Sequence, residues 1–334
     1  MNRSNDGVTN SFLRVFGRAR TRVPAPVLLL VGMFLLHTGS ALAVRAFDQV
    51  GALGVTWLRL SWAALLLLAV SGRSLWPAVR RATPRELGSV VILGTVSAGM
   101  MALYSAATAR IDLGTATALE FLGPLAVAVL ALRRRRELGW IAAAAVGVLF
   151  LTRPWSGEAD LAGVLLGLAG AGCVAFYIVL AQRVGSRFGA VHGLALALTV
   201  AAVVLTPLGA PPVLDAPSLR ILPVTLGIAL LYPLVPFLLE MLVLQRMSRT
   251  AFSTFISLEP AISLVMGMLL IAQTPVPLQV AGMALVVVAG IGAARSDSRA
   301  RPRRAARTTR REIPAPADTQ PPAADAQHTP EPVG

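Results

Sequence analysis

Two stretches of the chain read alike: TATALEFLGPLA over residues 115–126 and TAFSTFISLEPAI over residues 250–262. Each carries a glutamate, Glu120 or Glu259, shortly before a proline and within an otherwise apolar run. A charged side chain inside an apolar helix is costly, so it is normally retained only where it faces a cavity or a partner. The two stretches therefore predict two copies of one helical unit, each with an acid in its interior.

The composition of the chain is that of a membrane protein. Of its 334 residues, 55% are hydrophobic and only 14% are charged, and the mean hydropathy is +0.70. A soluble fold cannot cover that much apolar surface with so few charges, whereas a bilayer accepts it. Apolar stretches suited to membrane-spanning helices lie near residues 26–44, 50–70, 88–109, 113–132, 138–152, 161–182, 190–208, 221–244, 251–272 and 278–294.

The placement of the arginines predicts the orientation in the membrane. Of the 30 basic residues, all arginine, 25 lie in the tails and loops that face the cytoplasm if the N-terminus does. Four lie in the opposite loops, and Arg59 alone lies inside a span. Because positive charge is concentrated on the cytoplasmic side of membrane proteins, both termini are expected there, with an even number of spans. The net charge of +14 therefore does not indicate a nucleic-acid partner.

The two similar stretches stand five spans apart, which predicts a duplicated five-helix unit. Since five is odd, the second copy enters the membrane inverted, as in many secondary transporters; chance similarity between Ala/Leu-rich helices is the alternative. The predicted fold is an all-α polytopic membrane protein of ten transmembrane helices in two inverted five-helix repeats. The predicted segments are a cytoplasmic N-terminal tail at 1–25, the repeats at 26–152 and 153–294, and a disordered Arg/Pro-rich cytoplasmic tail at 295–334.

Ionisable residues inside the spans are the first candidates for a binding site: Arg59, Glu120, Glu240 and Glu259. Removal of a carboxylate from water favours its protonated form, so such a group can exchange protons or bind a substrate ammonium. Two structural alternatives stay open. Arg59 can pair with a carboxylate that holds two helices together, and Glu240 can pair with Arg246 or Arg249 near the inner end of its span.

Further candidates are polar-tipped side chains within spans that can line a cavity or simply pack: Tyr104, Tyr177, Tyr232 and His37. Pro124 and Pro260 are expected to bend their helices beside the two glutamates and to leave a carbonyl free for a ligand. Gly163, Gly167 and Ala171 form a ridge of small residues that indicates close helix packing. The sequence shows no catalytic motif, no metal-ligand cluster and no nucleotide fold, so neither an enzyme nor a cofactor is expected.

Several of these motifs together resemble a known family. The segment ALEFLGPLAVA at 118–128 is similar to the fourth-span signature of the threonine/homoserine exporter branch of the EamA family, in the drug/metabolite transporter superfamily. Weaker matches are LRL at 58–60, GAGC at 170–173, LEM at 239–241 and SLEPA at 257–261. The resemblance covers residues 26–294. It implies ten helices around a central cavity and efflux of small amino acids in exchange for protons.

The resemblance also carries over to single residues. Arg59, Glu120, Glu240 and Glu259 fall on positions where this branch has the same residues. His37 and Gln273 depart from it, because they stand where relatives tend to have an uncharged polar residue and a glutamate. These two departures leave the exact substrate open.

The sequence therefore predicts a multi-pass exporter in a bacterial inner membrane that works by alternating access. Its partners are a small-molecule substrate, protons and the lipid bilayer. Arg59 is expected to meet a substrate carboxylate, and Glu120 and Glu259 an amine or a proton. One alternative is a carrier for other substrates such as cationic compounds, and another is a non-transporting membrane assembly or signalling protein. The oligomeric state stays open between a monomer and a homodimer.

Overall fold

The structure is a computed structural model that describes residues 23–132, 138–156, 160–215, 218–244, 246–247 and 249–312. These residues are helical almost throughout, and no strand occurs among them. Eight helical segments of the described chain are long and apolar enough to cross a membrane, and a shorter apolar helix covers Leu113–Val127. Each of the ten apolar stretches picked out in the sequence coincides with helix.

The first helix, α2 (Ala25–Arg80), contains two of those apolar stretches, and its backbone is interrupted between them. Val50 and Gly51 leave the helical conformation, and Gly51 has a φ of 70°, a value that glycine tolerates and other residues rarely adopt. Gly72, with a φ of 50°, interrupts α2 again before its last turns. In those turns the Arg80 guanidinium lies 5.0 Å from the ring centre of the exposed Trp76.

The remaining elements follow in chain order: α3 (Pro84–Thr108), α4 (Leu113–Leu132), α5 (Leu138–Thr152), the short 3-10 helix η2 (Pro154–Ser156), α6 (Leu161–Phe188), α7 (Ala190–Asp215), α8 (Ile221–Ala229), η3 (Leu230–Leu234), α9 (Val235–Leu244), α10 (Arg249–Ile256), α11 (Glu259–Ile271) and α12 (Pro277–Glu312). Local sequence explains several starts. Thr83 and Glu86 form a capping box on α3, with Pro84 in its first turn, and the Asp160 carboxylate accepts the Gly163 N–H at the start of α6.

Two of the membrane-spanning segments are broken inside the bundle. The backbone of Tyr232 is extended (φ −157°, ψ 112°) in η3, so α8 and α9 are separate pieces of one span. A turn at Ser257–Leu258 separates α10 from α11, and Pro260 lies in the first turn of α11. At the second proline the expected bend is thus a two-residue turn that interrupts the span, whereas α4 continues as one helix through Pro124.

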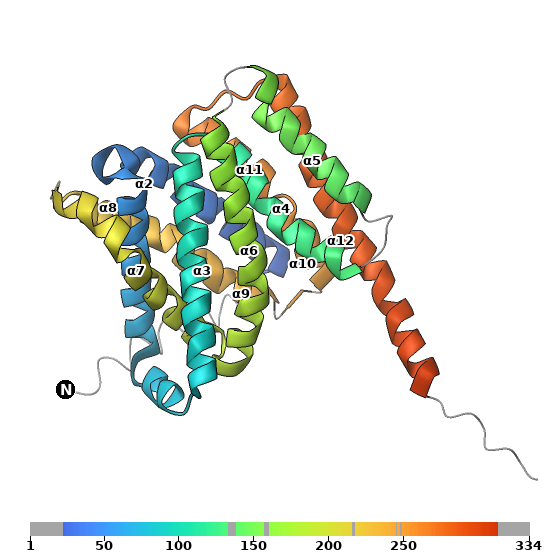
Figure 1. Ribbon diagram of the computed structural model, residues 1–334, viewed down its shortest axis with the longest axis horizontal. Helices are drawn as coiled ribbons and strands as arrows, with labels where there is room; N and C mark the ends of the chain where they lie inside the picture. The colour runs from blue at the N-terminus through green and yellow to red at the C-terminus, as the bar shows by residue number, and fades with distance from the viewer. Residues whose placement is uncertain are drawn as a thin grey trace, which may run out of the picture.

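Glycines set how closely the helices approach. A Cβ on Gly123 of α4 would lie 2.2 Å from the Ala171 carbonyl oxygen of α6, and one on Gly167 would lie 2.8 Å from Leu119. The ridge of small residues on α6 is thus a helix-packing seam, as predicted. Gly147 and Gly282 meet in the same way where α5 packs on α12, and Figure 1 shows these two helices side by side at one edge of the bundle.

The C-terminal part of the chain differs from the expectation of disorder. Helix α12 continues through the first part of the predicted tail, to Glu312, and extends away from the bundle (Figure 1). Alanine and arginine, which dominate this part, are both strong helix formers, which favours continuation of the helix. The predicted N-terminal tail up to residue 22 and the segment 313–334 lie outside the described residues.

Candidate functional site

Arg59, in the second half of α2, is 1% exposed and lies among the polar side chains that are buried inside the helix bundle. Its Nη2 donates a hydrogen bond to Ser105 Oγ of α3 at 3.1 Å, and Thr56 Oγ1 lies 2.7 Å from the same Ser105 oxygen. Its guanidinium carbon lies 4.2 Å from the ring centre of Tyr232, over the face of the ring. Arg59 Nε has no partner among the described residues, so the guanidinium has donors left for a ligand.

The structural alternative for Arg59, an ion pair with a carboxylate of another helix, is not found among the described residues, where a serine and an aromatic ring hold the guanidinium instead. Glu120 is nevertheless close enough to interact with it electrostatically. The break in η3 is what places Tyr232 under Arg59, since the extended residue turns its ring into the bundle.

A chain of hydroxyl groups joins three helices beside Arg59. Tyr104 Oη of α3 lies 2.9 Å from Thr117 Oγ1 of α4, which lies 2.7 Å from Ser263 Oγ of α11. The Tyr104 ring meets the Tyr232 ring edge-on, with centroids 6.4 Å apart and planes at 88°. These contacts hold α3, α4, α11 and the broken segment η3 next to one another.

The three interior carboxylates face this region from different helices. Glu120 stands in α4, Glu240 in α9, and Glu259 is the first residue of α11, where the positive end of the helix dipole favours an acid. Protein surrounds all three, yet each keeps part of its surface accessible; the Glu259 side chain is 25% exposed. Glu120 interacts electrostatically with Glu259, and Glu259 with Glu240. A partly accessible acid inside the bundle is what a binding space requires.

Space beside Glu120 comes from a glycine. A Cβ added to Gly170 of α6 would lie 3.9 Å from Glu120 Oε1 and 3.8 Å from Leu103. An alanine there would make ordinary contact, whereas a larger side chain would reach the carboxylate.

Glu240 does not form the ion pair with Arg246 that the sequence left open. Arg246 Nη2 donates instead to the carbonyl oxygen of Val23 at 2.9 Å. The Arg249 side chain is outside the described set. Tyr177 of α6, like Glu259, lies within electrostatic range of Glu240.

His37, in the first half of α2, is buried at the break between α10 and α11. Its Nε2 lies 3.7 Å from Glu259 Oε1, the side chain is 1% exposed, and neither ring nitrogen makes a hydrogen bond with a described residue. Ser40, one turn further along α2, also has an unpartnered buried hydroxyl. Between them, Gly39 presses against the broken helix: a Cβ there would lie 2.8 Å from Tyr232 Cβ.

The structure thus brings Arg59, Tyr104, Glu120, Glu259 and His37 around one interior region, with Glu240 and Tyr177 beside it. Sequence reasoning missed the hydroxyl groups that organise this cluster: Ser40, Thr56, Ser105, Thr117 and Ser263. Serine and threonine are common in membrane-spanning helices, so their type alone gives no signal.

Gln273, which departs from the family pattern, also has a structural role. Its Oε1 accepts the backbone N–H of Leu113 at 3.1 Å and so satisfies a free donor at the start of α4.

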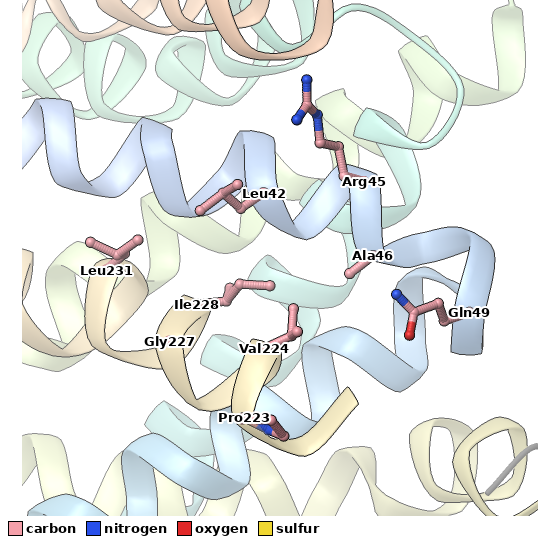
Figure 2. Close-up of a pocket in the computed structure, with 9 residues that line it drawn as sticks. All are labelled: Leu42, Arg45, Ala46, Gln49, Pro223, Val224, Gly227, Ile228 and Leu231. Carbon is pink, nitrogen blue, oxygen red and sulfur yellow. The ribbon is translucent and has the colours of Figure 1, made fainter. Parts of the chain in front are cut away.

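A cavity of about 350 Å³ lies apart from this cluster, between α2 and α8. Figure 2 shows Leu42 and Ala46 of α2 facing Val224 and Ile228 of α8 across it, while the Arg45 guanidinium points away from α8. Apart from Arg45 and Gln49 its lining is apolar, and it offers no opposed charges, so it is not the candidate site. In the described parts of the chain, no group of three or more His, Cys, Asp or Glu side chains is placed to hold a metal ion.

Charged side chains inside an apolar helix bundle, beside two helices broken at mid-span, are the arrangement of a membrane transporter. The family model described as the EamA-like transporter family matches residues 161–294. The Threonine/homoserine exporter RhtA of Escherichia coli (strain K12) is 34% identical over 269 residues, which cover 80% of this chain and 90% of the relative. The RhtA of Salmonella typhimurium (strain LT2) is 34% identical over 271 residues with the same coverage.

The chain therefore belongs to the EamA-like transporter family. A solved crystal structure with a TM-score of 0.54 and 17% identity covers 81% of this chain and 94% of its own, and shows that the fold is shared. Membership of a transporter family sets aside the non-transporting assembly or signalling role that the sequence left open.

Proposed function

We propose that this protein is a secondary-active exporter of small amino acids such as threonine and homoserine, located in a bacterial cytoplasmic membrane. The observation that carries the proposal is the grouping of Arg59 with two interior carboxylates: Glu120 interacts electrostatically with Arg59 and also with Glu259. A zwitterionic amino acid must have both of its charges compensated when it leaves water. The guanidinium provides a partner for the carboxylate, and the acids provide one for the ammonium.

The architecture that we propose is ten transmembrane helices in two inverted five-helix repeats, residues 26–152 and 153–294. Eight apolar segments are long enough to cross a membrane. Division of the first of them at Val50 and Gly51 gives nine spans, and the shorter helix α4 gives the tenth. Both termini then face the cytoplasm, in agreement with the arginine bias. The similarity of the stretches around Glu120 and Glu259 supports the duplication.

Alternating access coupled to protons is the mechanism that we propose. Among the described residues, Glu120, Glu240 and Glu259 outnumber the buried guanidinium of Arg59, so Arg59 cannot neutralise all three. A carboxylate that binds a proton when the substrate leaves, and loses it when the substrate arrives, makes the exchange electrically favourable. The broken helices supply short segments that can move around the site.

The test is counterflow of labelled threonine and homoserine in proteoliposomes, with and without a pH gradient. We expect gradient-dependent exchange, abolished by Glu120→Gln. Glu86→Gln is the matched control, because Glu86 forms an ion pair with Arg187 at the end of the bundle, away from the cluster. Folded protein that moves neither amino acid would contradict the proposed substrate, and equal flux in Glu120→Gln would remove this acid from the mechanism.

The excess of acids also favours a second candidate, a carrier for cationic compounds. Three interior carboxylates and one guanidinium leave a net negative interior when all are ionised. Uptake of a lipophilic cation that competes with threonine, or replaces it, would support this reading.

A further inference from the structure

We infer that His37, with Ser40, forms the part of the site that recognises a hydroxyl group on the side chain of the transported amino acid. The inference rests on the proposed function and adds a third polar contact to the two that bind the zwitterion. It concerns which amino acids are accepted.

Unpartnered polar atoms gather at this place in the structure. Buried side-chain nitrogens and oxygens without a hydrogen bond among the described residues belong to His37, Ser40, Arg59 and Ser71. Buried polar groups in proteins are nearly always hydrogen-bonded, so such a cluster indicates groups kept for a ligand. Ser71 lies at the far end of α2, and the other three adjoin the polar interior.

Geometry places His37 and Ser40 on one face of the site. They are three residues apart on α2, so their side chains point to the same side of the helix. His37 Nε2 lies 3.7 Å from Glu259 Oε1, too far for a hydrogen bond and close enough for both to contact one ligand. Ser40 lies beside Tyr104 and interacts with its hydroxyl, but no hydrogen bond of standard geometry joins the two, and the Tyr104 hydroxyl is engaged with Thr117.

The chemistry of these groups suits a hydroxyl. An imidazole can donate a hydrogen bond in any protonation state, and a serine hydroxyl can donate and accept. The carboxylate and ammonium of a zwitterion are already provided for by Arg59 and the glutamates. A substrate that ended in an alkyl group would leave His37 and Ser40 buried without partners, and a site built to hydrogen-bond a hydroxyl rejects the analogue that lacks it.

One compound tests this for both proposed substrates, because 2-aminobutyrate is threonine or homoserine with the hydroxyl replaced by hydrogen. The measurement is inhibition of labelled threonine counterflow by unlabelled threonine, homoserine and 2-aminobutyrate in proteoliposomes. We expect wild-type protein to prefer either hydroxy amino acid over 2-aminobutyrate by about tenfold. In His37→Leu the preference should fall close to one, with transport of 2-aminobutyrate retained.

Two further variants make the result interpretable. His37→Asn keeps a polar side chain and should retain part of the preference. Thr38→Val is the matched control, since Thr38 bonds the Phe34 carbonyl of its own helix at 2.6 Å, and its preference should equal that of wild type.

Unchanged preference in His37→Leu, or no preference in wild type, would overturn the inference while threonine transport itself stands. Loss of all flux in both folded His37 variants would also overturn it, because His37 would then serve the part common to all substrates. Absence of threonine flux in wild type would overturn both proposals.

Discussion

Replacement of Tyr232 by leucine should weaken substrate binding by removing the ring under Arg59. The guanidinium carbon is 4.2 Å from the ring centre and the arginine is buried, so the cation–π interaction is in its stronger, desolvated range of about 2 kcal/mol. If this interaction orients Arg59 toward the substrate carboxylate, its loss corresponds to about a 30-fold rise in the concentration of threonine needed for half-maximal counterflow.

The assay is threonine counterflow in proteoliposomes, with thermal stability of each purified variant measured in detergent. Tyr232→Phe is the control, because it keeps the ring face and the edge-on contact with Tyr104 and removes only the hydroxyl, which also interacts with Arg59. It should remain within a few-fold of wild type. Equal half-saturation in the leucine and phenylalanine variants, with both folded, would refute the idea that the ring orients Arg59.

Three more predictions concern other parts of the bundle. Gly170→Leu should abolish counterflow by filling the space beside Glu120, whereas Gly170→Ala should retain most of it. Thr117→Val should lower the free energy of unfolding by about 1–3 kcal/mol, since it removes the hydroxyl that joins Tyr104 of α3 to Ser263 of α11 and leaves Ser263 with only the Leu113 carbonyl oxygen as a partner, at 3.2 Å. The hydrogen bond from the Gly163 N–H, followed by the neighbouring arginine, holds the pKa of Asp160 below its ordinary value. The ionised Asp160 carboxylate therefore stabilises the fold at pH values above the ordinary pKa of an aspartate. This contribution to the free energy of unfolding disappears as the pH falls through the lowered pKa.

Each of these has a direct measurement. Threonine counterflow at equal protein loading compares the Gly170 variants, and full activity of the leucine variant would contradict the placement of the site. Chemical or thermal unfolding in detergent follows Thr117→Val, with Thr199→Val as control because Thr199 bonds only its own helix at Ala195. For Asp160→Asn, the melting-temperature deficit relative to wild type should shrink as the pH falls through the lowered pKa of Asp160. A deficit that grows at low pH would show that the carboxylate acts differently.

The positions of the helices could be predicted from the sequence because each depends on a local property. An apolar run of sufficient length becomes a helix in a bilayer wherever it occurs. The burial of Arg59, Glu120 and Glu259 was predictable for the same reason, since the flanking residues leave these side chains no route to the surface.

The details of the site depend on tertiary packing and could not be predicted from local sequence. Pro124 and Pro260 have the same local chemistry, yet α4 continues through the first and the chain breaks before the second. The position of Tyr232 under Arg59 depends on a break in η3 that no local pattern identified. Ser105 and Thr117 act through partners 46 and 13 residues away in the sequence, and only the assembled bundle brings these together.

The contact between Gly39 and Tyr232 has a mechanical consequence. A Cβ on Gly39 would lie 2.8 Å from Tyr232 Cβ, so no room is left there for even a methyl group. Gly39 lies between His37 and Ser40 in the sequence. We therefore expect this stretch of α2 to shift together with the break at Tyr232, which would couple the proposed recognition of the substrate to movement of the broken helix.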